Sequence, residues 1–396
     1  MISQKMLELG KKSSVIREIF EYGLKRKAEI GAENVFDFSL GNPSVPAPQR
    51  VTDIMKRLID ETPAEKLHGY TSGPGDMGVR TKISEYIKNK YSVEARPGLV
   101  YMTCGAAASL TITLNAIVEE GDEVIAFAPF FPEYRVFVEQ TGAKLTVVSC
   151  KKEDLQIDFE ALASAINEKT KAVIINSPNN PSGVIVPESD ILKLTALLNE
   201  KQKEFNKEIF LISDEPYREL VFTGEKVAYI PSVYDNSFVC YSYSKALSLP
   251  GERIGYIFVS PTMKQADDVF AAVCGAGRAL GYVCAPSLMQ YVISECLDDT
   301  ADVSIYEKNR NLLYNALTDI GYTVIKPDGA FYMFVKSLED DANAFYERAK
   351  KFDLLIVPSD SFGVEGFVRI SYCVDTDLIE RSIPAFKALY EDYKNE

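Results

Sequence analysis

The stretch of sequence that decides the fold, residues 238–259, is FVCYSYSKALSLPGERIGYIFV. Two apolar runs, 238–241 and 254–259, enclose a polar turn that carries Lys245 and Arg253. Apolar runs this short, bounded by turn residues, indicate buried strands of a largely parallel sheet. Ligands of such open α/β sheets bind beyond the carboxyl ends of the strands, so the turn after the first run is a candidate functional site.

Short apolar runs of the same kind recur through the middle of the chain, with helical stretches between them. They lie at residues 99–102, 124–128, 145–148, 172–175 and 209–212. Together with the two runs above, they predict an α/β fold with a mostly parallel seven-stranded sheet flanked by helices. Further along, a helix-rich stretch and four more runs predict a smaller α+β unit; the runs are 323–326, 331–335, 354–357 and 367–372.

These patterns divide the chain of 396 residues into a large and a small domain. We expect residues 46–290 to form the large, ligand-binding domain and residues 291–396 to form the small C-terminal domain. Residues 13–30 have the apolar spacing of an amphipathic helix. The N-terminal segment 1–45, which contains this helix, is expected to pack with the small domain.

Charge and composition limit the classes of partner. With 43 Lys and Arg against 57 Asp and Glu, the formal net charge is −14. An acidic chain repels phosphate backbones and anionic lipids, so we expect neither nucleic acid nor a membrane as a partner and favour small-molecule substrates. The most apolar long stretch, 269–289, carries Arg278, which argues against a membrane span.

The cysteines and the histidine point to a compartment and exclude one kind of site. Seven cysteines without a C-x-x-C pair are typical of reduced thiols in a cytoplasmic protein. Residues 1–14 lack the apolar core of a signal peptide. The single histidine, His68, cannot build a histidine-rich zinc site, so no metal is expected.

One group of turn residues suits a phosphate monoester. Gly105, Ala106 and Ala107 follow one of the short runs and would present backbone N–H groups at the start of a helix. Arg253 would add charged donors, and Ser242 would add a hydroxyl. These groups together predict a phosphate-binding turn.

Another group of turn residues suits a pyridine ring. A carboxylate, Asp214, would keep the ring nitrogen protonated, so that the ring can accept electrons. A tyrosine and an asparagine from these turns would hydrogen-bond the ring hydroxyl, and an aromatic side chain would stack on the ring. Lys245 would form a Schiff base. With the phosphate-binding turn, this set of side chains predicts pyridoxal 5′-phosphate as the cofactor.

The motifs that carry these residues resemble those of fold-type I pyridoxal-phosphate aminotransferases of class I and II, a family that includes aspartate aminotransferase. The most specific motif is Ser-x-Ser-Lys…Gly-x-Arg-x-Gly at 242–255. It follows Asn-Pro-Ser-Gly at 180–183 and Asp-Glu-Pro-Tyr at 214–217, and the resemblance spans nearly the whole chain. It implies a transaminase that acts by a ping-pong mechanism as a homodimer.

The resemblance also implies a role for each candidate residue. Lys245, Asp214 and Tyr217 are the catalytic residues, and Lys245 is the general base that moves the Cα proton. The cofactor-binding residues are Gly105, Ala106, Ala107, Phe131, Asn180, Asp214, Tyr217, Ser242, Lys245, Arg253 and Tyr70. Tyr70 reaches the phosphate of the neighbouring subunit. The substrate α-carboxylate is bound by Arg369, with Gly41 and Asn180 beside it.

The sequence departs from the family's pattern at two places. Phe131, which would stack on the ring, stands where the family often has Trp or Tyr. The phosphate-binding turn continues as Ala106-Ala107-Ala108 and lacks the Ser or Thr that many relatives place there. Backbone N–H groups must therefore contribute more of the phosphate binding.

The substrate pair is predicted from the charges available for a distal carboxylate. Some relatives carry a lysine in the phosphate loop, where this chain has Ala107. Arg278, and secondly Arg17 on the N-terminal helix, are the remaining candidates. We therefore expect aspartate and 2-oxoglutarate as substrates, with an alanine or aromatic aminotransferase as the alternative.

Two further classes of protein share these cofactor residues. A C–S β-lyase of the same fold, such as a cystathionine β-lyase, would release ammonia and pyruvate without an oxo-acid acceptor. A regulator that binds pyridoxal phosphate as an effector would need a basic DNA-binding domain. The net charge of −14 argues against the regulator.

Overall fold

The computed structural model describes residues 2–11 and 14–395. Within these residues, a central sheet of seven strands is ordered β2-β8-β7-β6-β5-β3-β4 and is parallel except for β8. This confirms the predicted α/β fold. The strands are β2 (Val100–Thr103), β3 (Glu123–Ala128), β4 (Lys144–Ser149), β5 (Thr170–Asn176), β6 (Phe210–Glu215), β7 (Ser237–Ser242) and β8 (Gly255–Val259).

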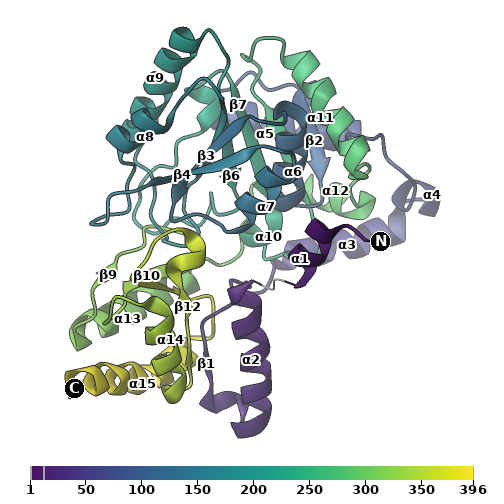
Figure 1. Ribbon diagram of the computed structural model, residues 1–396. Helices are drawn as coiled ribbons and strands as arrows, with labels where there is room; N and C mark the ends of the chain where they lie inside the picture. The colour runs from purple at the N-terminus through teal and green to yellow at the C-terminus, as the bar shows by residue number, and fades with distance from the viewer. Residues whose placement is uncertain (1, 12–13, 396) are drawn as a thin grey trace.

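Helices cover both faces of the central sheet (Figure 1). Successive residues of a strand point to opposite faces of the sheet, and both faces are apolar here. Ile212 of β6 packs in the apolar cluster under one set of helices, and Leu211 packs in the cluster under the other. The first set includes α5 (Met77–Tyr91), α6 (Ala106–Ile117) and α11 (Ala266–Leu280). The second set is α8 (Phe159–Ala165) and α9 (Glu188–Phe205).

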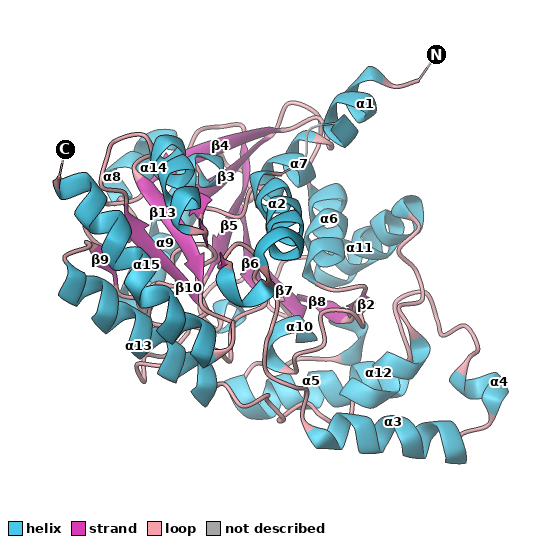
Figure 2. Ribbon diagram, turned by 90° about the horizontal axis from the view of Figure 1, so that it is seen from below, coloured by secondary structure: helices cyan, strands magenta, loops and turns pink. Residues whose placement is uncertain are grey.

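The smaller unit is built on an antiparallel sheet, ordered β12-β13-β10-β9 in the described part of the chain. Its strands are β9 (Val324–Ile325), β10 (Tyr332–Lys336), β12 (Val357–Pro358) and β13 (Phe367–Ser371). Figure 2 shows α13 and α15 side by side against this sheet. The helices of this unit are α13 (Ser304–Ile320), α14 (Ala342–Ala349) and α15 (Thr376–Lys394).

The N-terminal segment joins the smaller unit through backbone and side chains. β1 (Phe36–Asp37) pairs in parallel with β11 (Leu354–Leu355), and Ile19 of α2 (Val15–Ile30) lies in the same apolar cluster as β10 and β13. The side chain of Ser14 caps α2 by accepting a hydrogen bond from the backbone N–H of Arg17. Ser13, the predicted first residue of this helix, lies outside the described residues.

The remaining helices connect these layers. Short α7 (Glu133–Glu139) and α10 (Tyr243–Ala246) directly follow strand ends, so they place side chains at the edge where ligands are expected. Across the residues that the structure describes, no helix has the length and apolar character needed to cross a membrane. The other helices are α1 (Gln4–Lys11), α3 (Gln49–Glu61), α4 (Ala64–Leu67) and α12 (Ser287–Ile293).

Candidate active site

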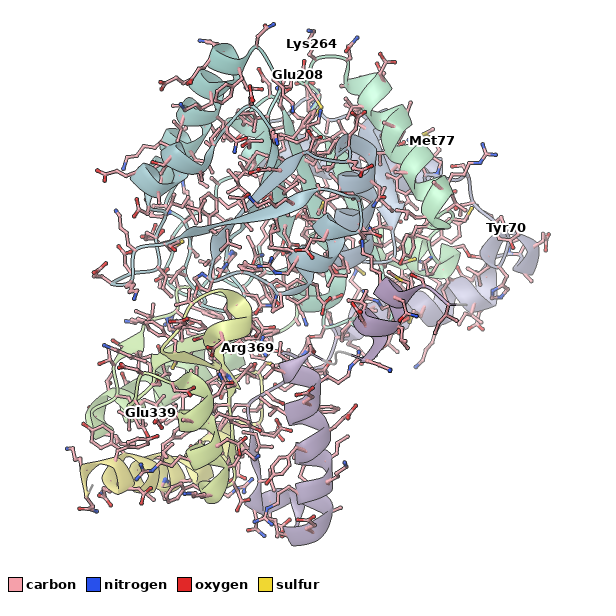
Figure 3. All side chains as sticks on the ribbon, in the orientation of Figure 1. Tyr70, Met77, Glu208, Lys264, Glu339 and Arg369 are labelled. Carbon is pink, nitrogen blue, oxygen red and sulfur yellow. The ribbon has the colours of Figure 1, made fainter. Side chains whose placement is uncertain are left out.

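The candidate site lies where the carboxyl ends of the central strands meet the smaller unit. Asp214 is near the end of β6, Lys245 is in α10 directly after β7, and Asn180 is in the turn after β5. Arg369 comes from β13 of the smaller sheet, and Figure 3 shows it at the junction of the two units. A hydrogen bond of 3.3 Å from Arg369 Nη1 to Asn180 Oδ1 crosses this junction.

Asp214 is a buried carboxylate with one free oxygen. Tyr134 donates a hydrogen bond of 2.5 Å to Oδ2, whereas Oδ1 has no partner among the described residues. Burial raises the pKa of Asp214 to about 7, against the opposite effect of the Tyr134 hydrogen bond. A buried carboxylate oxygen without a donor is unfavourable on its own, so Oδ1 is suited to accept a charged N–H from a ligand.

Lys245 has the properties of a nucleophile and a general base. Its Nζ donates a hydrogen bond of 2.7 Å to the backbone carbonyl of Gly41 and lies 5.3 Å from the centroid of the Phe331 ring. Burial lowers the pKa of Lys245 to about 8, and the charges of Arg253 and Arg369 act in the same direction. A sizeable fraction of the amine is therefore neutral near physiological pH.

Three chain segments meet closely at the predicted phosphate-binding turn. Gly105 caps the N-terminus of α6 with φ +92°, a conformation that favours glycine. A Cβ on Gly105 would lie 3.0 Å from Arg253 Nη2, and one on Gly255 would lie 3.3 Å from Ser242 Cα. The start of α6, the guanidinium of Arg253 and the segment of Ser242 thus lie close together, and their donors suit an anion; the Ser242 hydroxyl itself donates to Ser244 Oγ at 2.8 Å.

Arg369 is a buried cation with unused donor capacity. Its Nη2 donates a hydrogen bond of 2.5 Å to the carbonyl of Ser39, and its Nε has no partner within the described part of the chain. The side chain is 2% exposed, and burial lowers its pKa. A guanidinium held this way can bind a carboxylate through two parallel hydrogen bonds.

Two tyrosines in the site were not recognised as functional residues from the sequence. Tyr134 belongs to none of the sequence motifs, although it donates to Asp214. Tyr332 was not singled out, although its hydroxyl lies 2.9 Å from that of Tyr217. Tyr134 stands in the first turn of α7, shortly after the end of β3, and that position near a strand end is the signal that could have found it.

Three of the candidate residues, Tyr70, Arg278 and Arg17, are exposed on the single chain, and a fourth, Phe131, is half-buried. Tyr70 is 98% exposed and lies at the outer edge of the chain (Figure 3). Arg278 in the last turn of α11 and Arg17 on α2 are also exposed, as is His68. Phe131 is half-buried, with its ring edge-on to Tyr134 at a centroid distance of 5.8 Å.

Comparison with known families shows which protein family the chain belongs to. The sequence profile of aminotransferases of class I and II matches residues 33–386. The chain belongs to this family. The protein is therefore a pyridoxal-phosphate-dependent transaminase, as the sequence motifs predict. Its own residues fit that cofactor, because the free oxygen of Asp214 suits the ring nitrogen and the space at Gly105 suits the phosphate.

Individual relatives cover the whole aminotransferase. A solved amino transferase from Eubacterium rectale is 54% identical, covers 99% of both chains and superposes with a TM-score of 0.98. A probable aspartate aminotransferase of Methanocaldococcus jannaschii is 29% identical over 96% of this chain and 98% of its own. A (5-formylfuran-3-yl)methyl phosphate transaminase of the same organism is 28% identical over 98% and 99%. Relatives equally similar thus act on different substrates.

Proposed function

We propose that this aminotransferase takes an aspartate-type amino acid and 2-oxoglutarate as its substrate pair. The observation that carries its activity is the joint placement of three side chains at one junction: the buried carboxylate of Asp214, the half-buried amine of Lys245 and the buried guanidinium of Arg369. The name of the probable aspartate aminotransferase supports the dicarboxylate pair. Arg278 is the proposed partner of the distal carboxylate, and Arg17 is the second candidate.

The cofactor-side residues have distinct proposed roles. Pyridoxal phosphate, when bound, supplies a ring that accepts the electron pair left at the substrate Cα. Asp214 Oδ1 accepts the N–H of the ring, Phe131 stacks on its face, and Tyr217 and Asn180 bind its hydroxyl oxygen. The phosphate is held by Gly105, Ala106, Ala107, Ser242 and Arg253.

The substrate-side residues position the amino acid and move its proton. Arg369 binds the α-carboxylate, and Gly41 leaves room beside it. With the cofactor bound, Lys245 would hold it covalently, and once freed its Nζ would take the proton from the substrate Cα and return it on the cofactor side. The lowered pKa of Lys245, about 8, suits this task near neutral pH.

The proposal includes a homodimer in a cytoplasmic location. Tyr70 is 98% exposed on the single chain, as expected for a side chain that binds the phosphate in the neighbouring subunit. The seven cysteines, all within the described residues, are free thiols, which supports a reducing compartment.

Two-substrate kinetics of the wild-type enzyme and of Arg278→Ala test the proposed function. Double-reciprocal plots against amino acid at several oxo-acid concentrations should be parallel, and aspartate should be preferred over alanine. The preference should fall in Arg278→Ala or in Arg17→Ala. Intersecting lines would contradict the ping-pong mechanism. Equal use of alanine and aspartate, unchanged in both variants, would contradict the dicarboxylate substrate.

A further inference from the structure

The hydroxyl groups of Tyr217 and Tyr332 form an isolated pair inside the active site. Their oxygens are 2.9 Å apart, and both side chains are buried, at 5% and 3% exposure. Among the residues that the structure describes, neither hydroxyl has another hydrogen-bond partner. Each phenol carries one proton, so only one of the two can donate within the pair.

The direction of this hydrogen bond decides what Tyr217 can offer to a ligand. If Tyr217 donates to Tyr332, its oxygen can only accept hydrogen bonds from a third group. If Tyr332 donates, the proton of Tyr217 stays available. The role proposed for Tyr217, donation to the ring hydroxyl oxygen, needs the second arrangement.

The surroundings of Tyr332 keep its phenol protonated and place a cation on its ring face. Burial raises the pKa of Tyr332 to about 12; its charged and titratable neighbours are Arg369, Cys373 and Tyr217. The guanidinium of Arg369 stands over the Tyr332 ring, 4.7 Å from its centroid. A cation on the ring face increases the acidity of the phenol hydrogen without removing it.

The backbone at Gly41 fixes the other side of the same hydroxyl. A Cβ at position 41 would collide with the Tyr332 hydroxyl and would lie 2.7 Å from Tyr332 Cζ. The carbonyl of Gly41 in turn accepts the hydrogen bond from Lys245 Nζ. Tyr332 therefore packs between Gly41, whose carbonyl binds Lys245, and the phenol of Tyr217.

We propose that Tyr332 is a positioning residue that donates a hydrogen bond to the Tyr217 oxygen and so leaves the Tyr217 hydroxyl free to donate to the cofactor's ring oxygen. This inference rests on the proposed function, because it uses the roles of Tyr217 and Lys245. A donor to the ring oxygen stabilises the anionic form of that oxygen. It therefore lowers the pKa at which the visible spectrum of the resting, cofactor-loaded protein changes.

The test is a pH titration of the visible absorbance of the loaded protein, without substrate. Tyr332→Phe removes one oxygen and keeps the ring. We expect its midpoint to rise by about 0.5–1 pH unit, the effect of one neutral hydrogen bond. Tyr217→Phe should shift the midpoint upward at least as far. The double variant should shift no further than Tyr217→Phe alone, because Tyr332 acts through Tyr217.

A matched control separates this effect from the loss of any buried tyrosine hydroxyl. Tyr322→Phe removes a buried hydroxyl that donates to the Phe386 carbonyl at 2.9 Å, in the smaller unit. Its midpoint should equal that of the wild type. If Tyr332→Phe does not fold, Gly41→Ala displaces the same hydroxyl by steric contact and should also raise the midpoint.

The outcomes separate this inference from the proposed function. A wild-type midpoint in Tyr332→Phe would overturn the role of Tyr332. Full addition of its shift to that of Tyr217→Phe would also overturn it, because the two tyrosines would then act independently. If the wild-type protein forms no visible absorption band with pyridoxal phosphate, the proposed function fails and this inference fails with it.

Discussion

Tyr134 donates a hydrogen bond to one oxygen of Asp214, while the second oxygen of this buried carboxylate has no partner among the described residues. The carboxylate is thus oriented by the protein but only half satisfied. Since an unpaired buried acceptor is destabilising, the arrangement favours a ligand that brings a donor, above all a charged one. The ring nitrogen of pyridoxal phosphate is such a donor once it is protonated.

The cofactor-free protein should become more stable when Asp214 is replaced by asparagine. The folded-state pKa of Asp214, about 7, is above its ordinary value of 3.8, so the folded state binds more protons between these values. Wild-type stability therefore falls as pH rises from 4 to 7, by about 1.4 kcal/mol per pH unit at most. Asp214→Asn removes this loss, so its advantage should be full at pH 8 and should disappear toward pH 4.

Denaturant unfolding of the cofactor-free proteins at pH 5 and pH 8 measures this difference. Asp268→Asn, on the exposed side of α11, is the control and should follow the wild type at both pH values. In the loaded protein the order should reverse, because asparagine cannot pair with a charged ring nitrogen. Equal stability of Asp214→Asn and wild type at pH 8 would show that the carboxylate is not destabilising.

Tyr134→Phe should weaken cofactor binding without unfolding the protein. The variant loses a hydrogen bond to a charged group, which is worth about 1.5–3 kcal/mol, or roughly 10- to 100-fold in affinity. Tyr234→Phe loses a buried hydroxyl that donates to the Ile209 carbonyl at 2.7 Å, remote from the site, and serves as the control. Equilibrium titration with pyridoxal phosphate measures the affinity of both variants. An affinity of Tyr134→Phe equal to that of the wild type would show that Tyr134 does not contribute to cofactor binding.

Arg369 and Arg278 should affect different parts of the substrate. Arg369→Lys loses the planar pair of donors, so kcat/KM should fall by about 10- to 1000-fold for every amino acid alike, which is 1.4–4 kcal/mol. Arg278→Ala should lower kcat/KM for aspartate and glutamate and leave alanine unchanged. Steady-state assays with these three amino acids measure the pattern. If kcat/KM of Arg369→Lys fell only for aspartate and glutamate, Arg369 would bind the distal carboxylate and not the α-carboxylate.

Tyr70 provides a test of the shared site in the dimer. Tyr70→Ala and Lys245→Ala homodimers should each have little activity, for different reasons. If Tyr70 completes the site of the neighbouring subunit as proposed, one site of a mixed dimer would carry both substitutions and the other would carry neither. Unfolding and refolding the two variants together should therefore restore up to a quarter of wild-type activity. No recovery in confirmed mixed dimers would contradict the assignment of Tyr70.

The sequence was sufficient to predict the strands and the residues at their ends. Lys245 and Asp214 follow buried apolar runs, and the geometry of open α/β sheets brings such positions together. The contacts of Tyr134 and Tyr332 could not be predicted in this way. Each meets its partner across many residues, from 134 to 214 and from 217 to 332, and an aromatic residue in an apolar run is ordinarily a core residue.

The residues that depend on a second chain lie beyond what either the sequence pattern or the single chain can place. Tyr70 lies in a stretch without apolar periodicity, and its side chain is 98% exposed. Arg278 lies exposed in the last turn of α11, and no ion pair within the described residues fixes its direction. Their proposed roles come from the resemblance to the family, and the experiments above test each separately.

The central claim is that Lys245 and its neighbours carry a reversible amino transfer. The most direct measurement follows the visible absorbance of the loaded protein during titration with aspartate, glutamate, alanine and cystathionine, without an oxo acid. We predict stoichiometric conversion to the amino form of the cofactor, reversed by 2-oxoglutarate, and no conversion in Lys245→Ala. A band that persists while pyruvate and ammonia accumulate would contradict amino transfer and identify a lyase.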